Sequence, residues 1–168
     1  MLSSIEDCIP ALRAYAFTLL RDRQDADDLV HDCLVRALDK LHTRRDDADL
    51  RSWLFTIMHN VFVNQRRRAK ARPDAEALKE DEEEGAHGMS GDQEDHVRLK
   101  ELLRVLNGLP EDQRAVVFLV SVEDLSYAEV ARVLGVPVGT VMSRLARGRE
   151  RMREAAQEKG RPALRRVK

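Results

Sequence analysis

The chain has 168 residues, of which 35% are charged, 43% are hydrophobic and only 4% are aromatic. That length suits one or two small domains, and the abundance of Ala, Leu, Arg, Glu and Asp favours helices. No apolar run approaches the length of a membrane span, and the N-terminus lacks a signal-peptide pattern, so we expect a cytoplasmic protein without membrane insertion. Cys8 and Cys33 lack metal-ligand spacing, which predicts two small buried side chains, with a thiol switch as the alternative.

The net charge of −1 hides three segments of different charge. Residues 1–72 carry +2, residues 73–96 carry −9 and residues 97–168 carry +6. The middle segment has few large apolar groups, so it cannot bury enough surface to offset its ordering entropy. We therefore predict a flexible acidic linker over 73–96, between an N-terminal domain of residues 1–72 and a C-terminal domain of residues 97–168.

Three helices are predicted in the N-terminal domain. The first carries one apolar stripe, and the second begins near Asp25. The inward positions of the second helix are Leu29, Cys33, Ala37, Leu38 and Leu41. A polar loop, 42–49, precedes a third helix from about Leu50 to Lys70, which has a broad apolar surface and a basic end.

The C-terminal domain begins with two further predicted helices. The first runs over about 97–106, and Gly108 with Pro110 breaks it. Its inward positions are Leu99, Leu102, Leu103 and Leu106. The second helix is expected over 111–122, and the chain ends in a basic tail.

Residues 126–147 have the pattern of a helix-turn-helix. Gly135 ends a short helix, as a residue free to adopt positive φ should, and Pro137 stands at the start of the next. Val141 and Leu145 lie four apart on the inner face of that second helix. Its outer face offers Thr140, Ser143, Arg144 and Arg147. In this motif the second helix enters the DNA major groove, so the pattern indicates a DNA-binding protein.

Four stretches, in this order, resemble bacterial sigma factors of the extracytoplasmic-function (ECF) type. They are DADDLVHD at 25–32, LRSWLFTIMHN at 50–60, LPEDQR at 109–114, and LSYAEVA with PVGTVMSRL within 125–145. The resemblance covers about 9–72 and 97–156. It implies an all-α fold of two small helical domains, σ2 and σ4, with the acidic linker between them and no counterpart of σ1 or σ3.

The resemblance implies that the acidic helix of σ2 docks on the β′ clamp helices of core RNA polymerase, with Asp28, Asp32 and Arg36 as the contacts. From the residues alone, these carboxylates also suit a solvent-exposed face near a helix N-terminus. His31 with Asp27 and Asp28 could form a metal site, but ligands on one helix are weak support for one. We expect no metal and no cofactor.

The third helix would recognise the −10 element. By resemblance, Asn60 contacts a flipped −10 base, the loop 42–50 forms the pocket wall, and Asn64 is the next candidate. Backbone phosphates would be held by the basic residues that follow, Arg66, Arg67, Arg68, Lys70 and Arg72. A solvated helix end favoured by the dipole is the alternative for these cations.

In σ4, the outer face of the second helix of the motif would recognise the −35 element. Arg147 is the first choice for a base contact, because arginine binds guanine O6 and N7 bidentately. Arg144 suits a base or a phosphate, Ser143 faces out beside it, and Thr140 at the helix start suits a phosphate. Many family members have Arg and an aromatic residue where this chain has Met142 and Ala146, which leaves the −35 sequence open.

The resemblance also implies partners beyond DNA. The linker would thread the polymerase channels, σ4 would meet the β flap, and an anti-sigma factor, often membrane-bound, would hold the chain inactive at the inner membrane. The free chain is expected to be monomeric.

The function predicted is therefore an alternative sigma factor that directs core RNA polymerase to promoters. A sigma mimic that sequesters an anti-sigma factor without binding DNA is the main alternative, although such a mimic need not keep Asn60 or Arg147. A simple helix-turn-helix repressor would leave the σ2-like half unexplained. The sequence offers no catalytic residues, because no triad order, phosphate loop or carboxylate pair can be defended, and an enzyme is not expected.

Overall fold

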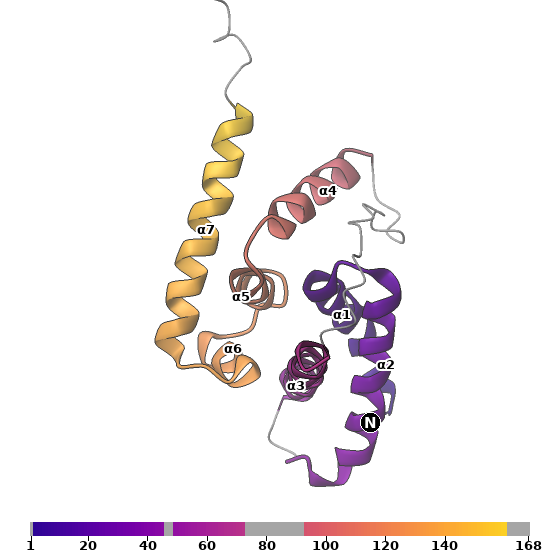
Figure 1. Cartoon of the computed structure of the whole chain (residues 1–168). Coiled ribbons are helices and arrows are strands. Elements are labelled where there is room, and N and C mark those ends of the chain that lie inside the picture. The colour runs from indigo at the N-terminus through magenta and orange to yellow at the C-terminus, as the bar shows by residue number, and fades with distance from the viewer. Residues whose placement is uncertain (1, 46–48, 73–92, 161–168) are drawn as a thin grey trace, which may run out of the picture.

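Helices make up all the regular structure in the residues that the computed structural model describes, which are 2–45, 49–72 and 93–160 (Figure 1). In chain order these elements are α1 (Leu2–Leu20), α2 (Arg23–Lys40), the 3-10 turn η1 (Leu41–Thr43), α3 (Leu50–Lys70), α4 (Gln93–Asn107), α5 (Glu111–Ser121), α6 (Tyr127–Leu134) and α7 (Val138–Gly160). The all-α prediction is confirmed. No helix in these ranges has the length and apolarity needed to cross a membrane.

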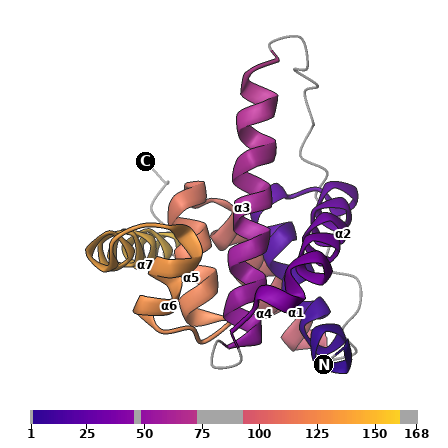
Figure 2. The ribbon, with the colours of Figure 1, turned by 90° about the horizontal axis from the view of Figure 1, so that it is seen from below.

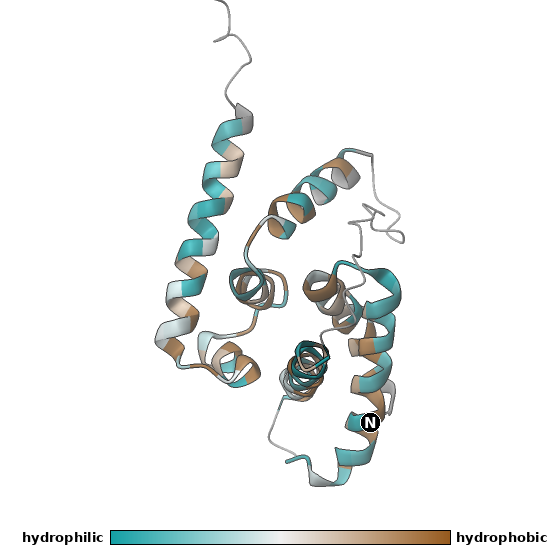
Figure 3. Cartoon of the chain, in the orientation of Figure 1, coloured by the Kyte–Doolittle hydropathy of each residue, from teal (hydrophilic) through white to brown (hydrophobic). Residues whose placement is uncertain are grey.

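The N-terminal half is a three-helix unit in which α1, α2 and α3 pack on one another. Side chains from all three helices fill its core, and Leu12, Leu29, Cys33, Leu54 and Met58 are essentially inaccessible to solvent. The helix starts are fixed locally, because Asp22 caps α2 and Asp49 caps α3 through side-chain oxygens that accept backbone N–H groups. Figure 3 shows the apolar faces of these helices turned toward one another.

The C-terminal half packs α5 against α7 and α6, with α4 attached more loosely along its length. Its core contains Val116, Leu119, Val130, Val141 and Leu145, all buried. Leu106, in the last turn of α4, is buried as well, whereas α4 and α7 diverge from that end (Figure 1). Val97 and Leu102, nearer the start of α4, are exposed.

Two inward positions predicted from the sequence are wrong. Leu38 is 50% exposed, because the buried stripe of α2 includes Ala37 and the next residue lies about 100° further around the helix. Leu102 is 46% exposed, because within the described ranges α7 diverges from α4 toward the start of α4.

The linker and the tail are only partly described. Helix α4 begins at Gln93, inside the segment 73–96 predicted as a linker. The rest of that segment, 73–92, and the end of the basic tail, 161–168, lie outside the described residues.

The two halves pack against each other through α1 with α5 and α3 with α6. Figure 1 shows α5 beside α1 and α6 beside α3, and Figure 2 shows that the C-terminal part of α3 projects beyond its neighbours. The basic end of α3 is therefore presented on a helix that stands clear of the body.

Candidate polymerase and nucleic-acid interfaces

The exposed face of α2 carries the residues predicted to dock on polymerase. Asp28 and Asp32 are exposed and lie one turn apart, and Arg36, one further turn along, is half-buried. Asp32 accepts a hydrogen bond from the Gln65 side chain on α3 at 3.0 Å. The structure thus brings all three predicted residues to one side of a helix whose opposite stripe is buried in the core.

The metal hypothesis at His31 gains no geometric support. His31 and Asp28 are exposed, and Asp27 pairs with Arg13 at 3.4 Å. Across the described ranges, no group of three or more His, Cys, Asp or Glu side chains is placed to hold an ion.

The two cysteines differ in their surroundings. Cys33 is fully buried, and burial raises the pKa of its thiol to about 12, so that it is protonated at neutral pH. Cys8 is half-buried and its Sγ donates to the Ser4 carbonyl at 3.3 Å. The prediction of a small buried side chain is confirmed for Cys33.

Helix α3 has one buried and one exposed face at the predicted −10 residues. Ile57, Met58 and Val61 are buried, whereas Asn60 and Asn64 are exposed one turn apart. Both amides are therefore held on a rigid helix and directed away from its own core. The predicted pocket wall at 42–50 is only partly visible, since residues 46–48 lie outside the described ranges.

The cations at the end of α3 do not all have the same environment. Arg67, Arg68, Lys70 and Arg72 are exposed where α3 projects from the body (Figure 2). Arg66 is exposed as well, but it pairs with Glu111 of α5, and its guanidinium lies 4.8 Å from the centre of the Phe62 ring. The structure thus separates Arg66 from the neighbours with which the sequence groups it.

The helix-turn-helix is formed as predicted. Ser126 and Glu129 make a reciprocal capping box at the start of α6. Gly135 ends α6 with φ of 65°, a left-handed conformation that glycine adopts at no steric cost. The Pro137 carbonyl accepts the backbone N–H groups of Thr140 and Val141, which starts α7.

The predicted DNA contacts on the outer face of α7 fall into two groups. Ser143 and Arg147 are exposed, and Thr140 is half-buried at the helix start. Arg144 is turned back toward α5, where its Nε lies 3.6 Å from an Asp112 carboxylate oxygen. Arg144 does not face out freely beside Ser143 as expected, because α5 of the same half offers it an acidic neighbour.

A cleft of about 340 Å³ lies where the halves meet. It is lined from α3 by residues including His59, Phe62 and Arg66, and from the other half by Glu111 and Arg144. Burial and, to a smaller extent, the nearby Arg144 charge lower the pKa of His59 to about 4. His59 Nδ1 lies 3.4 Å from the Tyr15 hydroxyl.

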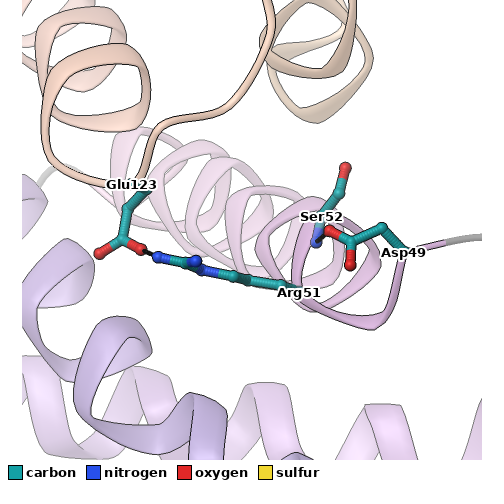
Figure 4. A network of polar contacts seen from close by, with 4 residues as sticks. All are labelled: Asp49, Arg51, Ser52 and Glu123. Atoms are coloured by element: carbon teal, nitrogen blue, oxygen red, sulfur yellow. Dashed lines mark hydrogen bonds and ion pairs between the residues drawn. The ribbon is translucent and has the colours of Figure 1, made fainter.

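The sequence did not predict several residues that join the two halves. Tyr15 and Phe118 stack across the junction, and Glu123 is buried against Arg51 (Figure 4). Tyr15 sits within the apolar stripe of α1, so its pattern indicates a core residue of its own half. No sequence pattern near Glu123 indicates that it contacts another domain.

Two family models match the chain, one on each half. The model described as the sigma2 domain of PhyR matches residues 5–59, and the model described as sigma-70, region 4, matches residues 99–152. The unmatched residues 60–98 between the two matches include the acidic segment 73–96.

Curated relatives match across both halves. The ECF RNA polymerase sigma factor EcfG of Rhodopseudomonas palustris is 34% identical over 145 residues, which cover 86% of this chain and 78% of that protein. The ECF RNA polymerase sigma factor SigM of Mycobacterium tuberculosis is 36% identical over 132 residues, which cover 79% of this chain and 64% of that protein.

Solved structures share the arrangement of the helices. The sigma factor RpoE of Bartonella quintana, solved in complex with the anti-sigma factor NepR, superposes with a TM-score of 0.76 at 31% identity, covering 92% of this chain and 95% of that one. CnrH, in complex with the cytosolic domain of CnrY, superposes with a TM-score of 0.60 at 24% identity over 94% and 86%, and supports the fold alone.

Proposed function

The chain belongs to the ECF family of RNA polymerase sigma factors, and on that basis we propose how its two halves divide promoter recognition. It acts in promoter-directed initiation of transcription as a regulator, and the polymerase supplies the catalysis. In the proposal, residues 1–72 form σ2, which binds core polymerase and the −10 element. Residues 97–168 form σ4, which binds the −35 element, and the acidic segment 73–96 connects them.

Docking on core polymerase is assigned to α2. Asp28, Asp32 and Arg36 share one side of a helix that is anchored by its buried face, so they can meet a basic partner without reorganising the domain. The partner is the β′ clamp helices, and σ4 contacts the β flap.

Recognition of the −10 element is assigned to α3. The observation that carries it is the exposure of Asn60 and Asn64, one turn apart, on a helix whose other side is closed by its own core. An amide at Asn60 can hydrogen-bond the edge of an unstacked base, which base recognition on a melted strand requires. Arg67 and Arg68, with Arg66 once it is released, follow on the projecting end and bind backbone phosphates.

Recognition of the −35 element is assigned to the first turns of α7. Arg147 and Ser143 are exposed there and can reach base edges in the major groove. Thr140, at the N-terminus of the same helix, suits a phosphate because backbone N–H groups and the helix dipole favour an anion. Arg144 joins this surface only after it leaves Asp112.

Regulation by an anti-sigma factor in the cytoplasm completes the proposal. The support is the similarity to RpoE, whose structure was solved with NepR, over nearly the whole length of both chains. A mimic that only sequesters such a factor would gain nothing from exposed Asn60 and Arg147 side chains, so a DNA-binding sigma factor fits the chain better.

The test of the −10 assignment is Asn60→Ala in reconstituted holoenzyme. We expect promoter-dependent transcription to fall by about 10- to 100-fold, the cost of one lost base contact, while affinity for core polymerase stays unchanged. The measurements are run-off transcription and core binding by fluorescence anisotropy. Arg13→Ala, a change at an exposed ion pair on α1, is the matched control and should alter neither. Equal loss of core binding in Asn60→Ala would contradict the assignment.

A further inference from the structure

A row of exposed apolar side chains runs along the first turns of α7. Val138 and Met142 are 42% and 52% exposed, and Ala146 is exposed one turn further on. Their spacing of four residues places all three on one side of the helix. A single exposed apolar side chain needs no explanation, but three in register, within the segment assigned to the −35 element, form a continuous apolar row.

The fold does not use this apolar row for packing. Helix α7 packs on α5 through a different row, in which Val141 and Leu145 are buried. Met142 lies about 100° further around the helix than Val141, and about 200° from Arg144, which faces α5. Figure 1 shows α7 on the side of the C-terminal half away from α1, α2 and α3. The apolar row is therefore no part of the core, and it stays accessible.

The charges around the apolar row favour a polyanion as its partner. From Val138 to Arg149 the sequence contains three arginines and no aspartate or glutamate. Of these arginines, Arg147 and Arg149 are exposed. The DNA major groove matches this combination, because phosphates line both of its edges and one of the bases presents an apolar group within it. DNA is therefore the partner that fits both the charge and the apolar row.

Thymine is the base that offers such a group. Its C5-methyl lies in the major groove, whereas guanine, adenine and cytosine present hydrogen-bond donors and acceptors there. The thioether of Met142 is a weak acceptor and Ala146 has no polar side-chain atom, so neither suits those polar edges. Met142 is unbranched and polarisable, which lets it adapt to a methyl group, and Ala146 is short enough for the helix to approach a base closely.

We propose that Met142 and Ala146 determine the −35 preference by packing on thymine C5-methyl groups, beside the base contact assigned to Arg147. This inference rests on the proposed binding of α7 to the −35 element, and it names the base for which that surface is selective. Residues four apart are separated by about 6 Å along the helix axis, which is close to two base steps of about 3.4 Å. Each residue therefore meets a different base pair, and thymines are expected at two positions of the element, on either strand.

The test removes only the methyl groups. A promoter that the wild-type holoenzyme transcribes is rebuilt with each −35 thymine replaced in turn by deoxyuridine, which keeps the hydrogen-bonding groups and lacks the C5-methyl. Run-off transcription at subsaturating holoenzyme gives the thymine-to-uracil activity ratio at each position for the wild type, Met142→Ala and Ala146→Gly. Because both templates meet the same protein, a loss of folded protein in a variant cancels from the ratio. Leu102→Ala, at a similarly exposed apolar residue on α4, is the matched control.

We expect the wild type to prefer thymine over uracil by about fourfold at two positions, the gain from burying one methyl group. Met142→Ala should lower the ratio toward one at one of these positions, and Ala146→Gly at the other, whereas Leu102→Ala should change neither. A wild-type ratio of one at every −35 position, an element without thymine on either strand, or ratios unchanged in both variants would overturn the inference. Failure of the proposed function would appear separately, as absence of promoter-specific transcription by wild-type holoenzyme.

Discussion

Helices α3 and α7 carry the proposed DNA contacts of the two halves, yet they present them differently. Helix α3 keeps Asn60 and Asn64 exposed and projects its basic end from the body. Helix α7 exposes Ser143 and Arg147 but turns Arg144 toward α5. The comparison teaches that position on a helix face does not settle whether a side chain is available, because a neighbouring helix of the same domain can offer it an ion-pair partner.

The largest effect is expected at Arg147, and it tests whether an exposed arginine on α7 contributes more to DNA binding than the ion-paired Arg144. Arg147→Ala should reduce −35-dependent transcription by about 10- to 100-fold and relax base preference at one position, because a bidentate arginine–guanine contact is lost. Arg144→Ala should cost less in the holoenzyme. Transcription assays on promoters with each −35 base changed measure both variants, and the exposed Arg151→Ala is the control. A larger loss in Arg144→Ala would reverse the two roles.

A smaller effect is expected where α7 touches its own half. A Cβ at Gly148 would lie 2.7 Å from Val117 Cγ2 of α5, whereas one at Gly139 would meet nothing within 4 Å. Gly148→Val should therefore lower the free energy of unfolding by about 2 kcal/mol through overpacking. Chemical denaturation measures it, with Gly139→Val as the matched change in the same helix. Similar losses in both variants would mean that the β-branched side chain, and not the close approach, is responsible.

The smallest effect is expected from pH at the junction. His59 faces Tyr15 of α1, Arg144 of α7 and the cleft carboxylates Glu111 and Asp112 of α5. With the two halves packed together, its pKa is about 4, below the ordinary 6.5, so this packing is favoured fully above pH 6.5 and loses the advantage as pH falls toward 4.

At pH 5.5 this linkage favours separation of the two halves by roughly tenfold relative to pH 8, when separation restores the ordinary pKa of His59. Small-angle scattering across that range measures it. His59→Gln should remove the part of the response between pH 6.5 and 5. Tighter packing of the halves on acidification, or an identical profile in the variant, would show that another group dominates.

The fold was predictable where local chemistry sets it. The expected third helix, Leu50 to Lys70, coincides with α3, because an Asp cap precedes it and a proline follows soon after its end. Gly135 ends α6 in the predicted left-handed conformation. These signals act within a few residues, which is the range over which a sequence pattern is informative.

The rest depends on contacts between distant residues. Arg51 and Glu123 are 72 positions apart, and neither belongs to a motif that indicates pairing. Leu38 and Leu102 match helical periodicity but remain exposed, because periodicity does not reveal which faces a neighbouring helix covers. Arg66 and Arg144 lie on the predicted helices, but only the position of α5 in the fold shows that Glu111 and Asp112 are their neighbours.

The most direct test of the central claim is transcription from a promoter library by core RNA polymerase with this chain added. We predict transcripts that begin downstream of two short shared elements at a constant spacing, and that are absent with core polymerase alone. Start sites identical to those of core polymerase alone, or no promoter-specific transcripts, would contradict the assignment of the two halves to the −10 and −35 elements.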